Sequence, residues 1–247
     1  MLGRMPDDIF EHPRLTAIYD ALIDPDRSDL DVYVALADEL SVRGVLDVGC
    51  GTGTFALMLA DRGLEVTGVD PADGSLRVAR AKGGADRVRW IHGDTTALPP
   101  LQVDLATMTG NVAQAIVDQA DWDRTLQGVR AALRPGGYLV FETRDPADKA
   151  WQQWNRTQTY RVTELDGVGA VESWFELTDV SEPFVSLRHT WIFAGDGAVL
   201  TSDSTLRFRD REEVQEALET HGYLVEEIRG APDRPGRELV FFARRAL

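Results

Sequence analysis

The chain has 247 residues, which is enough for one domain with a sizeable insertion. Hydrophobic residues make up 43% and charged residues 27%, so a mostly disordered chain is excluded. With 26 basic and 41 acidic residues the net charge is −15, and such a chain lacks the positive surface that binds nucleic acids or anionic membranes.

Residues 1–40 have the pattern of amphipathic helices. Apolar residues recur at three- and four-residue spacing from Leu15 to Ile23, and Pro25 then breaks the pattern. A second apolar stripe begins near Asp29. We therefore expect a helical N-terminal segment that lies over the rest of the protein.

Strands and helices alternate from residue 44 onward. The apolar patterns predict strands and helices at 44–48, 54–62, 64–69, 75–82, 87–91, 103–107, 122–133, 138–142, 211–220, 223–228 and 238–243. Nearly continuous apolar strands separated by helices are typical of a parallel sheet covered on both faces. The predicted fold class is therefore α/β, a Rossmann-like, doubly wound, mostly parallel seven-stranded sheet over residues 41–154 and 211–247.

Residues 155–210 interrupt this alternation. Long segments of alternating polarity, at 160–165, 171–178, 185–193 and 199–208, are separated by turn residues with no helix between them. This pattern predicts an antiparallel β-meander inserted into the α/β domain.

A glycine-rich turn follows the first strand and carries Gly49, Gly51 and Gly53. Glycines at alternating positions let the backbone turn tightly and let a ligand approach without meeting a Cβ. Asp70 ends the next strand, 21 residues after Gly49, where a carboxylate can accept both hydroxyls of a ribose. Together these residues predict a cofactor that contains a nucleoside.

The residues around the glycines narrow the choice of cofactor. A dinucleotide fingerprint requires glycine where Thr54 stands, which argues against a nucleotide-dependent oxidoreductase. Asp47, two residues before the first glycine, would repel a pyrophosphate but suits a positively charged ligand such as an α-amino group.

The residues 45–53, VLDVGCGTG, resemble the first motif of the class I S-adenosylmethionine-dependent methyltransferases. Residues 66–71 resemble the second strand of that family with its ribose-binding acid, and residues 93–95 the loop after its third strand. Residues 133–137, LRPGG, are similar to its late motif. The resemblance covers roughly residues 15–150 and 211–245, and it includes the order and spacing of the motifs.

The resemblance implies that the cofactor is S-adenosylmethionine. Asp47 would hold its amino group, Asp70 its ribose, and Asp94 with Thr95 its adenine. The full set of implied cofactor contacts is Asp47, Gly49, Cys50, Gly51, Gly53, Asp70, Pro71, Asp94, Thr95, Thr109, Gly110 and Asn111. The helices of residues 1–40 would correspond to the lid of the family.

Methyl transfer from a sulfonium is an in-line displacement that depends mainly on positioning and needs no metal. A base is required only when the acceptor loses a proton, and the candidates are His189, Tyr19 and His12. Alternation places His189 on an apolar strand face, so a packed histidine is the alternative, and Tyr19 has the corresponding alternative of a core tyrosine. The histidine spacing and the single cysteine predict no zinc site.

The candidate acceptor-binding residues are Tyr19, Arg144, Trp154, Arg156 and Trp191. The two arginines would bind an anionic group, and the meander of residues 155–210 would cover the substrate. Its position after the fifth strand loosely resembles N-methyltransferases of nucleotide-linked amino sugars and some peptide N-methyltransferases. Aromatic residues that fill a core are the alternative interpretation.

The leading functional prediction is N- or O-methylation of a small molecule by an S-adenosylmethionine-dependent enzyme. The alternative is a catalytically silent relative that binds the cofactor as a sensor or interaction module. Because the sequence has one cysteine, no signal-peptide pattern in residues 1–15 and no apolar run of about 18–20 residues, a cytoplasmic location is expected. The predicted partners are a small-molecule acceptor and at most a second copy of the chain, with no nucleic acid and no membrane.

Overall fold

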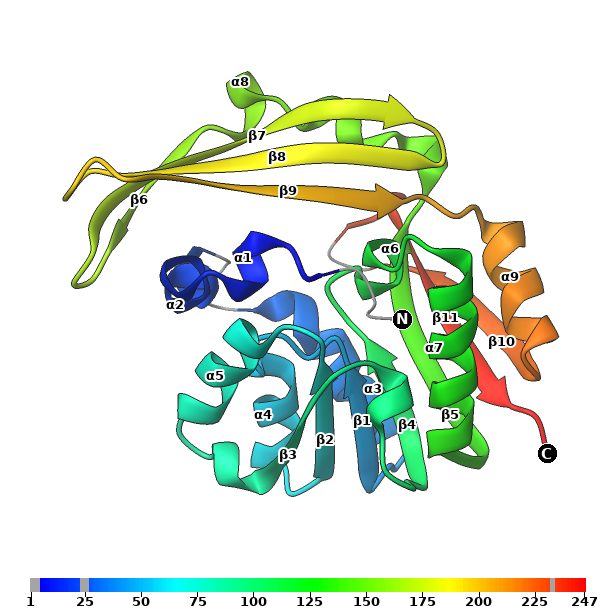
Figure 1. Ribbon diagram of the computed structural model, residues 1–247. Coiled ribbons are helices and arrows are strands. Elements are labelled where there is room, and N and C mark those ends of the chain that lie inside the picture. The colour runs from blue at the N-terminus through cyan, green and yellow to red at the C-terminus, as the bar shows by residue number, and fades with distance from the viewer. Residues whose placement is uncertain (1–4, 23–26, 232–233) are drawn as a thin grey trace.

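The computed structural model describes residues 5–22, 27–231 and 234–247, and it contains two β-sheets (Figure 1). The larger sheet has seven strands in the order β10-β11-β5-β4-β1-β2-β3. Their bounds are β1 (Gly44–Val48), β2 (Glu65–Asp70), β3 (Val88–His92), β4 (Val103–Met108), β5 (Leu133–Arg144), β10 (Tyr223–Gly230) and β11 (Glu238–Arg245). Strands β1 to β5 are parallel, and β11 runs antiparallel to both of its neighbours. The predicted Rossmann-like fold class is confirmed.

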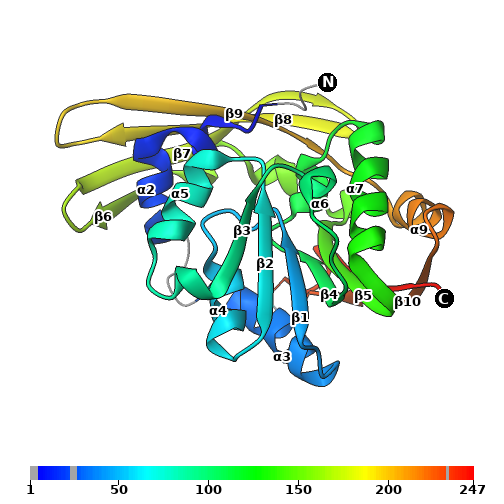
Figure 2. The ribbon, with the colours of Figure 1, turned by 60° about the horizontal axis from the view of Figure 1, so that its bottom comes forward.

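Helices cover both faces of this sheet (Figure 2). One face packs against α3 (Asp31–Glu39) and α4 (Thr54–Asp61), and the other against α7 (Gln119–Ala132) and α9 (Arg211–Thr220). Helix α5 (Asp73–Ala81) lies beside β2 and β3, and the short helix α6 (Val112–Ala115) follows β4. The carboxyl ends of β1, β2, β4 and β5 meet at one edge of the sheet, where ligands bind in folds of this kind.

The smaller sheet is the predicted antiparallel meander. It consists of β6 (Arg161–Leu165), β7 (Gly169–Ser181), β8 (Phe184–Phe193) and β9 (Val199–Arg207), paired in chain order. It lies across the carboxyl ends of the parallel strands (Figure 1). Strand β7 is longer than predicted because a register shift between Leu177 and Asp179 lets pairing continue to Ser181. The helix α8 (Arg156–Thr159), which Asn155 caps, was not predicted.

The N-terminal helices α1 (Asp8–Glu11) and α2 (Pro13–Leu22) lie between the two sheets (Figure 1). The Glu11 carboxylate accepts hydrogen bonds from the backbone N–H groups of Asp73 and Gly74, at the start of α5. On the other side, Leu15 and Ile18 pack against the meander. The predicted helix end at Ile23 and Pro25 lies outside the described residues.

Two general features of the structure bear on the predicted partners. No helix in the described part of the chain is long and apolar enough to span a membrane. Within residues 5–22, 27–231 and 234–247, no group of three or more histidine, cysteine, aspartate or glutamate side chains could hold a metal ion.

Candidate active site

The three glycines of the turn between β1 and α4 all have positive φ, of +72°, +53° and +78° for Gly49, Gly51 and Gly53. A Cβ on Gly49 would lie 2.5 Å from the side chain of Val112, and one on Gly53 would lie 2.4 Å from Trp90. A Cβ on Gly51 would meet nothing within 4 Å. Gly49 and Gly53 therefore permit close packing of the protein, and Gly51 is the one of the three that faces open space.

Asp70 joins this turn to the end of β2. Its Oδ2 accepts a hydrogen bond of 2.8 Å from the N–H of Gly51, and its Oδ1 accepts one of 2.8 Å from the N–H of Ala72. Burial raises the pKa of Asp70, and these two hydrogen bonds oppose the rise. Because each carboxylate oxygen has two lone pairs, the side chain can hold the turn and still accept hydroxyl groups of a ligand.

We expect Asp70→Ala to weaken binding of the demethylated cofactor, S-adenosylhomocysteine, by about 1.5–3 kcal/mol, the range for a hydrogen bond to a charged group. Asp70→Asn should also bind S-adenosylhomocysteine weakly. The amide of asparagine has a single acceptor oxygen, which cannot replace both carboxylate oxygens that accept from Gly51 and Ala72. Titration calorimetry measures both losses. Asp94→Ala is the comparison and should lose less; an equal or larger loss there would contradict the importance given to Asp70.

Asp47 is a buried carboxylate in β1 with 1% exposure. Its Oδ1 accepts a hydrogen bond of 3.3 Å from Thr107 Oγ1, and its Oδ2 has no hydrogen-bond partner among the described residues. Burial raises its pKa to about 7, and the nearby carboxylates of Asp70 and Glu142 contribute to the rise. A buried carboxylate oxygen without a partner is costly, and an ammonium group would satisfy it. Asp47 thus fits the amino group of S-adenosylmethionine.

The titration of Asp47 predicts a pH dependence of stability. The folded protein holds this proton up to about pH 7, whereas the ordinary pKa of an aspartate is 3.8. Between these values the free energy of unfolding should fall as pH rises, by up to about 1.4 kcal/mol per pH unit. Glu142, whose pKa burial raises to about 7, adds to the same slope.

We therefore expect Asp47→Asn to flatten this decline and to remove most of the affinity for S-adenosylhomocysteine at pH 8. Urea unfolding at pH 5, 6, 7 and 8 measures the slope. The exposed Asp38 provides the control variant Asp38→Asn, which should keep the slope of the unchanged protein. An unchanged slope in Asp47→Asn would show that this carboxyl group does not titrate in that window.

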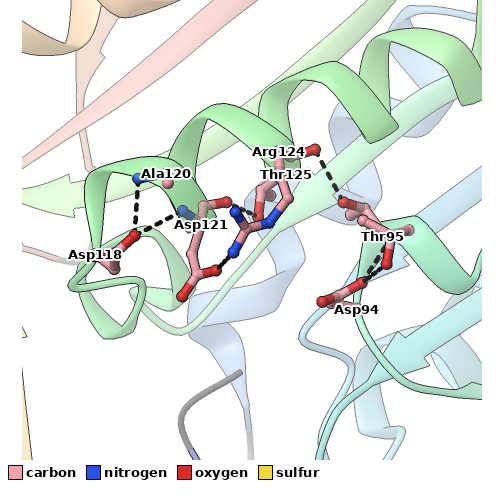
Figure 3. Close-up of polar contacts among 8 residues, drawn as sticks. Asp94, Thr95, Asp118, Ala120, Asp121, Arg124 and Thr125 are labelled. Atoms are coloured by element: carbon pink, nitrogen blue, oxygen red, sulfur yellow. Dashed lines mark hydrogen bonds and ion pairs between the residues drawn. The ribbon is translucent and has the colours of Figure 1, made fainter. Parts of the chain in front are cut away.

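The loop after β3 contains the predicted adenine contacts (Figure 3). Asp94 is exposed, and its Oδ1 accepts hydrogen bonds from the N–H and Oγ1 of Thr96, at 2.8 and 2.5 Å. The Thr95 side chain is buried and donates to the Arg124 carbonyl oxygen on α7, at 3.3 Å. The side chain of Asp94 is thus accessible to a ligand, whereas the side chain of Thr95 anchors the loop to α7.

The residues after β4 adjoin a buried polar cluster formed by Tyr33, Asn111, Glu142 and Glu238. Asn111 donates from its N–H to Glu142 Oε1, at 2.8 Å, and from Nδ2 to Glu238 Oε1, at 3.0 Å. The Tyr33 hydroxyl donates to Glu142 Oε2. The half-buried Thr109 and the exposed Gly110 precede this cluster, and a Cβ on Gly110 would meet nothing within 4 Å. Open space therefore adjoins the carboxyl end of β4 as well as the glycine turn.

Cys50 and Pro71 are two further residues that are predicted to contact the cofactor. The Cys50 side chain is buried, and a Cβ on Gly68 would lie 2.9 Å from its sulfur. Burial also raises the pKa of the Cys50 thiol. The carbonyl oxygen of Pro71 lies 3.0 Å from Nε2 of His92. We therefore expect Cys50 and Pro71 to contact a cofactor through their backbone atoms and not through reactive side chains.

Helix α2 is attached to the glycine turn through Asp20, which sequence reasoning did not single out. Asp20 accepts a hydrogen bond of 2.6 Å from Thr52 Oγ1, and Lys82 Nζ lies 2.6 Å from its other oxygen. The preceding Tyr19 is half-buried, and burial raises its pKa to about 12, with Asp70 among the nearby charges. At neutral pH Tyr19 is thus a hydrogen-bond donor near the turn.

The two histidine candidates for a base occupy different settings. His189 is buried between the rings of Phe175 and Trp191, with centroid distances of 4.0 and 3.7 Å. Burial lowers its pKa to about 3, so it is neutral at physiological pH. At the end of α1, His12 Nδ1 accepts a hydrogen bond from the N–H of Arg14, at 3.2 Å.

The predicted acceptor residues do not all come together. Arg144 and Trp154 line a cavity of about 310 Å³ beside the carboxyl end of β5. Arg156 is exposed and lies over the Trp174 ring, 4.3 Å from its centroid. Trp191 is fully buried against α2. Arg144 and Trp154 are thus the two candidates that face a common space.

Sequence reasoning missed two members of the polar cluster. Tyr33 falls on the apolar face of an amphipathic helix, and Glu238 begins the last strand, so neither stands out in the local pattern. The one available signal was Glu142, an acidic residue near the carboxyl end of an apolar strand.

Known methyltransferases share the part of the chain that contains the glycine turn. A methyltransferase domain model matches residues 45–137, which include the glycine turn and the ends of β2, β3 and β4. The chain is 32% identical to the cypemycin N-terminal methyltransferase of Streptomyces sp over 120 residues, which are 48% of this chain and 49% of that protein. The chain spans about half the length of the first curated relatives it matches.

Solved structures share the fold over almost the whole chain. The CcbJ methyltransferase of Streptomyces caelestis superposes with a TM-score of 0.77 and 22% identity, covering 94% of this chain and 96% of that one. The sugar N-methyltransferase KedS8 of Streptoalloteichus sp ATCC 53650 has a TM-score of 0.74 and 18% identity, covering 100% and 96%. The matched methyltransferase domain of residues 45–137 and the shared fold agree with the resemblance of the glycine turn to that of the class I S-adenosylmethionine-dependent methyltransferases.

Proposed function

We propose that this protein transfers a methyl group from S-adenosylmethionine to a small-molecule acceptor. The observation that carries the proposal is the buried Oδ2 of Asp47, which has no hydrogen-bond partner among the described residues, beside a glycine turn whose Gly51 faces open space. An anionic partner would be repelled there, whereas a cofactor with an ammonium group satisfies the carboxylate.

The residues of this chain have separate parts in the proposed reaction. Asp47 would hold the amino group of the cofactor, Asp70 its ribose hydroxyls and the accessible Asp94 its adenine. When bound, S-adenosylmethionine would supply its sulfonium methyl group: an acceptor lone pair would form a bond to the methyl carbon in line with the breaking sulfur–carbon bond, and S-adenosylhomocysteine would leave with that electron pair. The remaining task of the protein is to position the acceptor and exclude water, which is worth about 7–11 kcal/mol in favourable cases.

Acceptors that must lose a proton need a base, and the candidate residues differ in their protonation state and in their surroundings. Tyr19 is protonated at neutral pH and would orient the acceptor or the cofactor by donating a hydrogen bond. His189 is neutral, but a pKa of about 3 makes it a weak base, and the rings of Phe175 and Trp191 enclose it. His12 stays a weaker candidate. The lid role of residues 1–40 and the substrate-cover role of residues 155–210 are part of this proposal.

The relatives suggest a range of acceptors. Their names include a cypemycin N-terminal methyltransferase, a ubiquinone biosynthesis O-methyltransferase and a sugar N-methyltransferase. We propose N- or O-methylation of a small metabolite and no nucleic-acid partner. The predictions of a monomer or homodimer and of a cytoplasmic location stay predictions.

Incubation with S-[methyl-³H]adenosylmethionine and a small-molecule extract tests this function. We expect label to appear in an extracted metabolite with the unchanged protein and to be lost with Asp70→Ala. The alternative is a catalytically silent relative that acts as a sensor. Calorimetric binding of S-adenosylhomocysteine without any transfer from a broad panel of extracts would favour that alternative.

A further inference from the structure

The cavity beside the carboxyl end of β5 contains a concentration of positive charge. We call it the arginine cavity, and its walls include Arg144, Trp154, Phe175, Arg234, Arg237 and Glu238. The described residues that line this cavity thus include three arginines and one carboxylate, Glu238, in a chain whose net charge is −15. Because the protein as a whole is acidic, a cavity with this local excess of positive charge differs sharply from its surroundings.

The single carboxylate does not neutralise the three arginines. Arg234 is paired with Glu238 at 2.7 Å. Arg144 lies 3.9 Å from the same oxygen, beyond hydrogen-bond distance, and its Nη1 donates to the neutral Gln114, at 2.9 Å. The Arg237 side chain has no hydrogen bond or ion pair with any described residue. Burial lowers the pKa of Arg144, which shows that its charge is poorly solvated. An anion in this cavity would compensate the charge.

The same cavity offers an apolar surface next to the charge. The Arg144 guanidinium lies over the ring of Trp154, 5.5 Å from the centroid. Phe175, from β7 of the meander, also contributes to the wall. A ligand with an anionic group and a flat or apolar body would therefore find complementary surfaces for both parts.

The arginine cavity leads toward the cofactor residues. A second, smaller cavity of about 30 Å³ shares Arg234 and Glu238 with it and is also lined by Gly110 and Glu142. Gly110 follows β4, where open space adjoins the backbone. A ligand anchored in the larger cavity would therefore lie near the residues that follow β4.

We propose that the arginine cavity binds the methyl acceptor and that the acceptor carries a carboxylate or a phosphate, held by Arg144 and Arg237 next to Trp154. This inference rests on the proposed function, because it names the chemical class of that acceptor. The anionic group would anchor the molecule, and the methylated atom would lie at its other end.

Binding of simple anions tests the site without any turnover. Inorganic phosphate and benzoate are titrated separately by calorimetry at low ionic strength, which distinguishes a phosphate site from a carboxylate site. We expect at least one of them to bind, and Arg144→Gln and Arg237→Gln each to weaken it at least tenfold. Arg237→Gln removes a side chain without partners among the described residues, so it keeps the test valid if Arg144→Gln fails to fold.

The control is Arg89→Gln, an exposed arginine on β3 at the opposite edge of the sheet. It should change the anion affinity less than twofold, and all three variants should keep the affinity for S-adenosylhomocysteine. Absence of binding for both anions, or equal binding in Arg237→Gln and Arg89→Gln, would overturn the inference.

Methyl transfer separates this inference from the proposed function. Aromatic and aliphatic amines and alcohols are supplied as free acids, as phosphate monoesters and as neutral methyl esters. We expect the charged forms to be methylated with a kcat/KM at least tenfold higher, and Arg237→Gln to remove that preference through KM. Equal methylation of charged and neutral forms would refute the anionic acceptor and leave the transferase intact. Anion binding without methylation of any compound would refute the proposed function and leave the anion site.

Discussion

Gly51→Val should abolish binding of S-adenosylhomocysteine while the protein stays folded. Gly51 has a φ of +53°, and the space beyond its Cα is open, so a branched side chain there would project into the place proposed for the cofactor. The backbone conformation alone costs a non-glycine residue roughly 1–2 kcal/mol. The affinity, measured by calorimetry, should fall below detection, since bulk and strain act together.

Gly63→Val is the matched control for this prediction. Gly63 follows α4 and has a φ of +82°, and a Cβ at this position would likewise meet nothing within 4 Å, but it lies at the opposite end of the helix from the turn. Both variants should lose a similar free energy of unfolding in urea, and only Gly51→Val should lose the ligand. Retained affinity in Gly51→Val would remove the turn from the cofactor site.

Replacement of residues 155–210 by a short linker should yield a protein that aggregates. The buried residues Trp191 and Phe193 of the meander pack against Leu15 and Ile18 of α2, and removal of the meander would expose that apolar face. Arg209 at the edge of the deletion is also buried and donates to carbonyl oxygens after β4. Size-exclusion chromatography and binding of a hydrophobic dye measure the outcome, because exposed apolar patches promote association.

The proposed cause of aggregation is tested by a second truncation that also carries Leu15→Ser and Ile18→Ser. If α2 is the exposed surface, the polar substitutions should restore a soluble, monodisperse protein that binds S-adenosylhomocysteine. A simple truncation that is already soluble would show that the meander is not needed to cover α2. That protein would then reveal whether the meander covers the substrate, since methyl transfer could be measured directly.

The periodic spacing of apolar residues within strands and helices predicted most of the fold. Strand and helix periodicity located the parallel sheet and the meander, and the spacing from Gly49 to Asp70 indicated a nucleoside site. The predicted helix at residues 211–220 agrees with α9 at both ends, since Asp210 caps its first turn. The bounds of β5 were less well predicted, because its pairing with β4 begins at Leu133, before the glycines of the turn.

Contacts between distant parts of the chain could not be predicted in this way. Tyr33 and Glu142 are 109 residues apart in sequence, and Asp20 and Thr52 are 32 apart. No local period links such residues, so their pairing depends on the tertiary packing. The different roles of the turn glycines are a similar case, because the neighbours Val112 and Trp90 come from other elements.

The position of α1 and α2 between the two sheets has a consequence for the order of folding. The N–H of Ile9 donates to Ser202 Oγ, and Arg14 forms a bidentate ion pair with Asp196, across separations of 193 and 182 residues. During synthesis these helices are complete long before their partners on the meander exist. Contacts that close such long loops form late, because the chain loses conformational entropy on closing the loop before the contacts can stabilise it. The contacts of these helices with the meander therefore form late, and a ribosome-bound chain that stops before residue 196 would leave the apolar side of α2, with Leu15 and Ile18, accessible to proteases and chaperones.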